Sequence, residues 1–182
     1  KSGATVLGTG SSLLLGQTHV GQAITVTASY VDGFNAPESQ VSAATVAVSN
    51  VNDAPTGTVT ISGTAQQGRT LMASNTLVDA DGLGPVTYTW KTGETVLGSG
   101  GSLLLGQTHV GQAITVTASY VDGFNASESQ VSAATVAVAN VNDAPSGSVT
   151  ISGTAEQGRT LTASNTLVDA DGLGPVTYTW KS

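Results

Sequence analysis

The chain has 182 residues, and its 12 acidic and 5 basic side chains give a net charge of −7, which excludes the basic stripe that nucleic-acid binding requires. It contains no cysteine, so disulfides and thiolate metal sites are excluded, and no apolar run approaches the ~18 residues of a membrane span. Only 9% of the residues are charged and 39% are hydrophobic, which indicates an all-β protein with many polar outward faces.

A period of 90 residues runs through the chain, and shifting the sequence by 90 aligns it with itself without a gap. Between residues 1–90 and 91–180 only ten positions differ, so 80 of 90 are identical. Copies this similar are explained better by tandem duplication in a longer array than by separate catalytic roles.

The first element in chain order is a partial repeat, residues 1–50, which holds only the last four strands (C′ to G) of a predicted immunoglobulin-like unit. Residues 51–56, "VNDAPT", follow as a linker in which Pro55 stiffens the backbone. The complete unit then begins at residue 57.

Seven strands are predicted in this complete repeat, residues 57–140, because apolar and polar residues alternate there with a period of two. In chain order the strands cover residues 57–62, 70–74, 86–91, 95–98, 102–106, 113–120 and 133–140. We expect Trp90, Val136 and Val138 to face inward. Turns that carry Gly, Asn and Asp separate the strands, so the fold predicted is an antiparallel β-sandwich.

Residues 141–146 form a second linker, and residues 147–182 hold only strands A to C of a third repeat. The two partial repeats are complementary, because together they supply the strands of one unit. We therefore expect the chain to be a window from a longer array, or a protomer whose ends complete one another head to tail.

The differences between copies test the predicted strand faces. Positions 49, 58 and 72 lie on strands, and all three fall on faces that we predict to point outward. Met72 is replaced by Thr162 in the next copy, a change that a packed core would resist.

Acidic residues gather at one predicted pole of the sandwich, where the linker meets the B–C loop (78–85) and the F–G loop (121–129). The candidate metal ligands of the first joint are Asn52, Asp53, Asp79, Asp81, Asp122 and Glu128, and by repetition those of the second are Asn142, Asp143, Asp169 and Asp171. Crowded carboxylates repel one another unless water or a cation offsets their charge. An all-oxygen ligand set suits Ca²⁺, which takes about six to eight oxygens, so calcium is predicted to stiffen the joints.

A second interpretation of the same residues needs no ion. Asp79 and Asp81 are ordinary turn residues that can accept hydrogen bonds from their own backbone, and Gly82 can supply a positive φ. Asp122 and Gly123 fit a tight turn for the same reason. Both interpretations stay open at this stage.

The "NDAP" linkers (52–55, 142–145), the "DADG" loops (79–82, 169–172) and Trp90 ahead of "SLLLGQTHVGQAITVTASY" carry a family resemblance. They resemble the tandem immunoglobulin-like and cadherin-like repeats of giant bacterial surface adhesins, in the extender region of the RTX type. The resemblance covers the whole chain. The chain lacks the cysteine pair between the sheets, and it also lacks the glycine-rich nonapeptide of a calcium-binding β-roll. It implies an extracellular stalk on the bacterial cell surface.

These observations favour a structural extender or fibre-forming repeat whose partners are neighbouring identical repeats, head to tail. The alternative is a multivalent module that binds glycan or protein through its F–G loops, where Phe34 and Phe124 lie. An enzyme is not predicted, because no nucleophile elbow is present and His19 and His109 fall in solvated loops.

Overall fold

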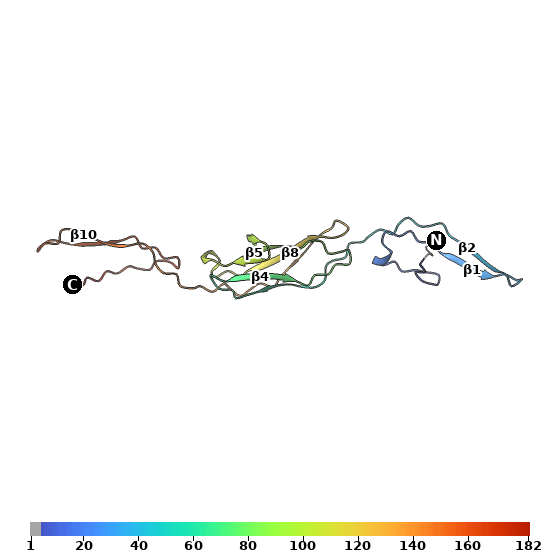
Figure 1. Cartoon of the computed structure of the whole chain (residues 1–182), viewed down its shortest axis with the longest axis horizontal. Helices are drawn as coiled ribbons and strands as arrows, with labels where there is room; N and C mark the ends of the chain where they lie inside the picture. The colour runs from blue at the N-terminus through green and yellow to red at the C-terminus, as the bar shows by residue number, and fades with distance from the viewer. Residues whose placement is uncertain (1–4) are drawn as a thin grey trace. The chain divides into compact units, whose positions relative to one another are not determined.

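The computed structural model describes residues 5–182 and is all-β, as predicted, with several antiparallel sheets that are consistent with a β-sandwich (Figure 1). Within the described residues the helical elements are two single turns of 3₁₀ helix, η1 (Gln17–His19) and η2 (Gln107–His109). Residues 1–4 of the first predicted partial repeat lie outside this range.

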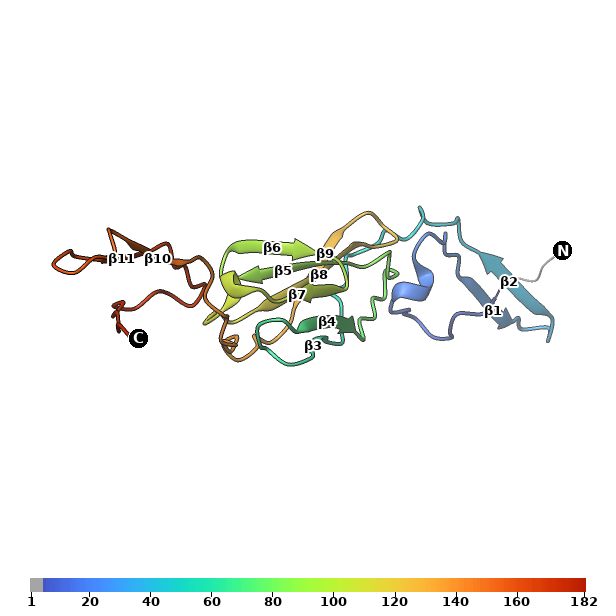
Figure 2. The same cartoon turned by 60° about the vertical axis from the view of Figure 1, so that its left-hand side comes forward.

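Seven strands between residues 59 and 131 form two sheets (Figure 2). The three-stranded sheet has the order β3 (Val59–Ser62), β4 (Thr70–Asn75), β7 (Ser102–Leu104), and the four-stranded sheet has the order β6 (Thr95–Ser99), β5 (Thr87–Thr92), β8 (Thr115–Val121), β9 (Ser127–Val131). Six of these strands correspond to the segments predicted from the alternation of apolar and polar residues.

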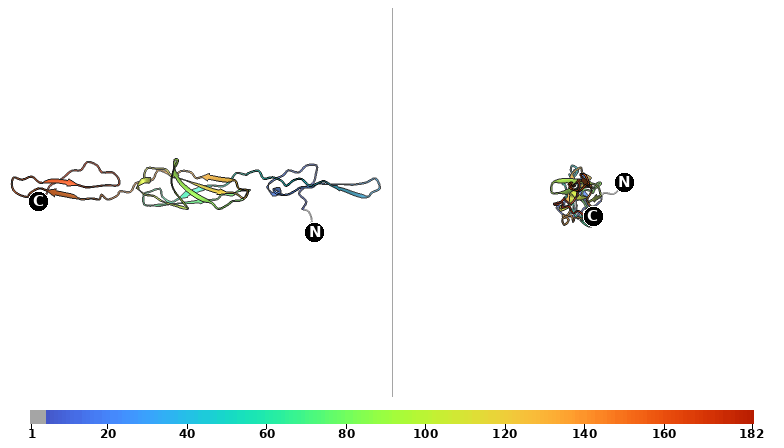
Figure 3. Two further views of the ribbon diagram at one scale, coloured as in Figure 1. Left: turned by 90° about the horizontal axis from the view of Figure 1, so that it is seen from above. Right: turned by 90° about the vertical axis from the view of Figure 1, so that its left-hand side faces the viewer.

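Two further hairpins lie on either side of these sheets in the sequence (blue and orange in Figure 3). They are β1 (Thr27–Val31) with β2 (Pro37–Val41), and β10 (Val149–Ser152) with β11 (Thr162–Asn165). Val149 pairs with Asn165 as Val59 pairs with Asn75, so the same sequence adopts the same antiparallel register in both copies.

The last predicted strand is wrong. Residues 133–140 form only isolated bridges at Val138 and Ala139, while the strand beside β8 is β9, in a segment that we expected to be part of the F–G loop. Because β9 is an edge strand that buries little, its sequence lacks the apolar alternation used for the prediction. Val136, predicted to face inward, is 78% exposed, whereas Val138 is buried.

The core of the central repeat contains Trp90, as predicted. The largest fully buried side chains are Trp90, Leu71, Leu105, Ile114 and Val116. Trp90 also donates a hydrogen bond from Nε1 to the carbonyl of Gly100 at 2.8 Å, so its polar atom is satisfied in the interior. Met72 is half exposed, which confirms the outward face inferred from its replacement by threonine.

Two compact units divide the chain. The first comprises Lys1–Gly57, Leu77–Val86 and Ser119–Ser129, and the second comprises Thr58–Thr76, Thr87–Ala118 and Gln130–Ser182. The first linker is therefore in one compact unit with the B–C and F–G loops that follow it, and the second linker is in one unit with the B–C loop of the third repeat. The domain boundaries proposed from the sequence stay a prediction.

Candidate functional site

The first linker is paired with the loop it precedes. Thr56 and Val78 exchange two backbone hydrogen bonds, with N···O distances of 2.8 and 3.0 Å, in an isolated antiparallel bridge. This bridge brings residues 51–56 alongside the B–C loop and places Asp53 beside Asp81.

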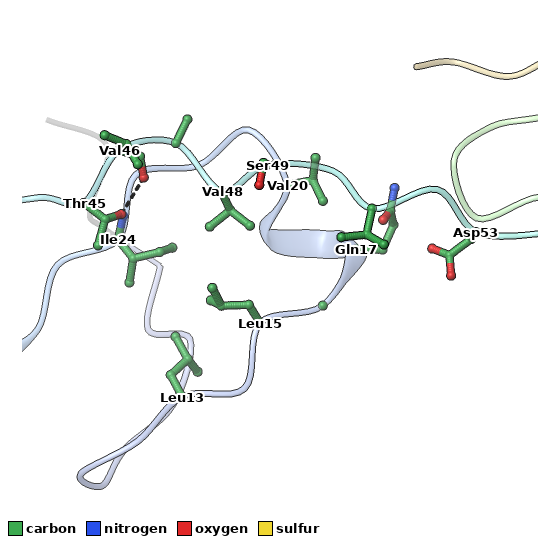
Figure 4. Close-up of a pocket in the computed structure, with 13 residues that line it drawn as sticks. Leu13, Leu15, Gln17, Val20, Ile24, Thr45, Val46, Val48, Ser49 and Asp53 are labelled. Atoms are coloured by element: carbon green, nitrogen blue, oxygen red, sulfur yellow. Dashed lines mark hydrogen bonds between the residues drawn. The ribbon is translucent and has the colours of Figure 1, made fainter. Parts of the chain in front are cut away.

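Asp81 joins three segments of the chain through one carboxylate. Its Oδ2 accepts a hydrogen bond from the backbone N–H of Asp53, and its Oδ1 accepts one from Nε2 of Gln17, both at 2.7 Å. Gln17 opens η1 in the E–F loop of the first repeat (Figure 4), residues 16–22, which is equivalent to residues 106–112 between β7 and β8. Because Asp81 is only 4% exposed, these two donors replace water around a buried charge.

The second linker repeats this arrangement. Asp171 accepts a hydrogen bond from the backbone N–H of Asp143 at 2.8 Å and another from Nε2 of Gln107 at 3.2 Å. The Asp143 N–H, followed by the side chains of Asn140 and Gln107, lowers the pKa of Asp171 below its usual value. The same three groups therefore meet at both linkers, 90 residues apart. They are the carboxylate of the B–C loop aspartate, the backbone N–H of the linker aspartate and the side-chain amide of a glutamine.

Gln67 adds a further contact at the second linker. Gln67 lies in the A–B turn of the central repeat, residues 63–69 between β3 and β4. Its Nε2 donates to Oδ2 of Asp143 at 2.7 Å, and its Oε1 accepts from the backbone N–H of Val141 at 3.1 Å. The amide of Gln67 thus holds both the entrance and the middle of the linker.

Asp79 lies behind Asp81 and shapes the B–C loop. Its Oδ1 accepts the backbone N–H of Asp81 at 2.8 Å, and its Oδ2 accepts the hydroxyl of Tyr120. Burial, and then this hydrogen bond to Asp79, raises the pKa of Tyr120 well above its usual value. In the third repeat Asp169 accepts the N–H of Asp171 in the same way, at 2.9 Å.

Asp122 builds the turn between β8 and β9. Its Oδ1 accepts backbone N–H groups of Phe124 at 2.9 Å and Ala126 at 2.7 Å, and its Oδ2 is buried without a hydrogen-bond partner. The next residue, Gly123, donates its N–H to the carbonyl of Asp81 at 3.1 Å. The F–G turn is thereby tied to the B–C loop.

The asparagines of the two linkers have different partners. Asn52 donates to Oε1 of Glu128 at 2.7 Å, and Glu128 lies on strand β9, not in the loop in which we expected it. Asn142 donates to the backbone carbonyl of Asp143 at 3.1 Å. The structure thus gathers the predicted residues of the first joint, and those of the second, around their linkers.

The arrangement of the carboxylates favours hydrogen bonding over a cation cage. Among residues 5–182 no three His, Cys, Asp or Glu side chains form a group that could hold a metal ion. Both oxygens of Asp79 and of Asp81 already accept hydrogen bonds, which a cation would have to displace. As they lie, these residues do not fit a calcium site, and calcium binding stays a prediction.

Sequence reasoning missed the glutamines Gln17, Gln67 and Gln107. The search for a cation site selected carboxylates and passed over the uncharged amides of the E–F loop and the A–B turn. An amide is suited to this position because it donates to a carboxylate and accepts from a backbone N–H. His19 and His109 are not part of the joints, since their Nδ1 atoms accept the backbone N–H of Gly16 and Gly106.

No family model matches this sequence, and no curated protein or solved structure matches it either. The resemblance to adhesin repeats therefore rests on the sequence motifs alone, which are the NDAP linkers, the DADG loops and Trp90 ahead of the segment 102–120. In the part of the chain that is described, no helix has the length and apolar character to cross a membrane.

Proposed function

We propose that this chain is a structural extender segment of an extracellular bacterial surface protein, in which hydrogen-bonded linkers join successive all-β repeats. The observation that carries the proposal is the recurrence of one set of contacts. At both linkers an aspartate of the B–C loop accepts the backbone N–H of the linker aspartate and the amide of an E–F loop glutamine.

These contacts restrict the linker on both sides. A hydrogen bond to a charged group contributes about 1.5–3 kcal/mol when it is shielded from water, and the partly buried bonds of Asp81 meet that condition better than those of Asp171. Pro55 removes further backbone freedom. A stalk needs joints that keep their geometry, and this combination supplies them without a bound ion.

Spin labels on either side of the first linker test the proposal. Ser39 and Ser129 are equivalent exposed positions in successive repeats, and the chain has no cysteine, so Ser39→Cys with Ser129→Cys gives two unique labels. We expect a narrow distance distribution by pulsed electron paramagnetic resonance. Gln17→Ala should broaden it, because one of the two bonds to Asp81 is lost.

Gln67→Ala is the matched control, because Gln67 contacts only the second linker through its side chain. It should leave the distribution between residues 39 and 129 unchanged. A distribution that is already broad in the unmodified sequence, or one that Gln17→Ala does not alter, would contradict the proposal.

Calcium binding is the second candidate for the stiffening, and one observation favours it. Oδ2 of Asp122 is buried and has no hydrogen-bond partner. The next residue, Gly123, is hydrogen-bonded to Asp81. In the same experiment, a distribution that narrows with calcium and broadens with a chelator would support this candidate. The hydrogen-bonded joint predicts no change in either condition.

A binding module is the alternative function, and the exposure of one aromatic side chain favours it. Phe34 is 94% exposed at the tip of the β1–β2 turn, where an aromatic ring could stack on a sugar or insert into a partner protein. Binding to a glycan or protein array that Phe34→Ser together with Phe124→Ser abolishes would support it.

A further inference from the structure

The turn between β8 and β9 leads into the strand through the tripeptide Asn125-Ala126-Ser127 (Figure 2). An asparagine is followed there, two positions later, by a hydroxyl side chain, and the residue between them is not proline. This is the acceptor pattern for sugars that are linked to an asparagine side chain. Asn125 is the only one of the eight asparagines of the chain that stands in this pattern.

The backbone of the turn explains why both copies have an asparagine at this position. Asn35 and Asn125 have φ angles of 64° and 68°, in the left-handed region that asparagine adopts more readily than most other residues with a side chain. The two copies differ two positions later, where the first repeat has Pro37 and the central repeat has Ser127. The turn therefore accounts for the asparagine, and Ser127 alone completes the acceptor pattern.

Asp122, and not Asn125, provides the side-chain hydrogen bonds that hold the turn. Its Oδ1 accepts the backbone N–H groups of Phe124 at 2.9 Å and Ala126 at 2.7 Å. Asn125 donates its backbone N–H to the carbonyl of Asp122 at 3.3 Å, whereas its side-chain amide donates no hydrogen bond within residues 5–182. A substituent on this amide would therefore break no hydrogen bond of the turn.

Both side chains of the acceptor pattern are accessible. Asn125 and Ser127 are exposed, so an enzyme can reach the amide and the hydroxyl together. The central repeat has all seven strands of its two sheets and a linker on each side, so this exposure belongs to the complete unit. A bulky, hydrophilic sugar requires such a surface turn.

We propose that Asn125 is the acceptor of an asparagine-linked sugar, transferred from a donor in which the anomeric carbon is bonded to a diphosphate. The amide nitrogen bonds to the anomeric carbon, and the bond from this carbon to the diphosphate oxygen breaks, with its electron pair leaving on the diphosphate. One of the two amide protons passes to a base of the transferase. The products are an N-glycosyl amide and the free diphosphate carrier, which is a nucleotide or a lipid.

Glycosylation of Asn125 goes beyond the proposed function, with which it shares only the extracellular location. It depends on the F–G turn and not on the hydrogen bonds at the linkers. Sugar attachment and the spin-label distances are separate readouts, so either proposal can fail while the other stands.

Trypsin separates the two turns and so provides an internal control. Cleavage after Lys1, Arg69, Lys91 and Arg159 places Asn35 in the peptide 2–69 and Asn125 in the peptide 92–159. In the protein isolated from cells that produce it, we expect mass spectrometry to show a sugar on Asn125 in peptide 92–159 and none on peptide 2–69. An unmodified peptide 92–159 would overturn the proposal.

Two reactions in vitro distinguish the donors. The folded chain is incubated with an asparagine glucosyltransferase and UDP-glucose, or with an oligosaccharyltransferase and a lipid-linked oligosaccharide. The first donor should add the mass of a hexose to peptide 92–159, and the second should add a whole oligosaccharide in one step. A reaction in either arm supports the proposal and identifies a donor that this turn accepts, whereas no reaction in both arms would contradict the accessibility of Asn125.

Variants at the third position of the pattern test whether the hydroxyl is read. Ser127→Pro gives the central turn the sequence of the first, which forms the same kind of hairpin with Pro37 at the start of β2. This variant should keep its melting temperature and lose the sugar, while Ser127→Thr should keep the sugar. Pro37→Ser should create a second acceptor at Asn35. A sugar that persists in Ser127→Pro, or a peptide 2–69 that stays unmodified in Pro37→Ser, would overturn the assignment.

Discussion

At the scale of single residues, the carboxylate of Asp81 explains how a short linker is held. It accepts hydrogen bonds from groups that lie 28 and 64 residues earlier in the chain, one in the linker and one in the preceding repeat. Asp171 is held by the same two kinds of donor. At Asp171 the donors stabilise the ionised form of the carboxylate, so this contact depends on the charge of the aspartate.

The lowered pKa of Asp171 therefore predicts how the second joint responds to acid. Because the folded pKa lies below the unfolded value of about 3.9, the stabilisation is fully present above that value. It is lost as the pH falls through the folded pKa. Carbon-detected NMR titration of the Asp171 carboxyl group should give a midpoint below the ordinary value.

Variants of the side-chain donors check this assignment. Gln107→Ala with Asn140→Ala should move the midpoint part of the way back, because the Asp143 N–H is the larger cause and remains. Gln17→Ala, which acts at the other linker, should leave it in place. A normal midpoint for Asp171 in the unmodified chain would be inconsistent with the joint described.

Sequence reasoning selected these aspartates but assigned them a different role. Asp53, Asp79 and Asp81 were singled out because acids crowd at one pole, and the structure does place them around the linker. What the pattern could not show is that the carboxylates of Asp79 and Asp81 accept hydrogen bonds from N–H and O–H donors, which depends on the orientation of loops in three dimensions. The glutamines were missed because an amide carries no charge to attract notice.

At the scale of elements, close backbone contact joins the B–C loop to strand β8. A Cβ atom added to Gly84 would lie 2.1 Å from the carbonyl oxygen of Val121, which is closer than such atoms approach. Both groups are backbone, so neither can move aside without displacing its segment. The position requires glycine for packing and not for its backbone angles.

Gly84→Ala should therefore destabilise the central repeat by about 1–3 kcal/mol, the cost of forcing extra volume into a packed site. Thermal unfolding followed by circular dichroism would show this as a melting temperature lower by several degrees. The expected direction follows from the steric clash alone.

Gly101→Ser is the control for this variant. The added Cβ would meet nothing within 4 Å, and the first repeat already carries Ser11 at the equivalent position. Its melting temperature should stay close to that of the unmodified chain. Equal stability of the Gly84→Ala and Gly101→Ser proteins would contradict the packing described.

Six of the seven strands were predictable from their sequences, and β9 was not. The burial of side chains alternates most clearly in β4 and β8, because one face of each is covered. β9 escaped because both of its faces are largely accessible and Ser, Glu and Gln occupy most of it. The segment 133–140 was predicted to be a strand because its valines alternate with other residues. It is not one, and Val136 points to solvent.

At the scale of the whole molecule, the 90-residue period is the dominant property of the sequence. It gives two hairpins the same register, β3–β4 and β10–β11, and gives both linkers the same hydrogen-bonded aspartate. It also makes the two partial repeats complementary. A chain organised in this way is suited to extension by repetition, and the proposed stalk function uses this property.

The amide hydrogens of Asp53 and Asp143 provide the most direct measurement of the central claim, which is that hydrogen bonds to the B–C loop hold both linkers. Each amide donates to a carboxylate, so both should exchange with solvent slowly relative to an unstructured peptide of the same sequence. Hydrogen exchange followed by NMR reads the two linkers in one sample. The predicted result is protection of both amides in the unmodified chain. In the Asp81→Ala variant the amide of Asp53 should lose its protection, while the amide of Asp143 should keep it. Exchange of both amides at the unstructured rate in the unmodified chain would contradict the account.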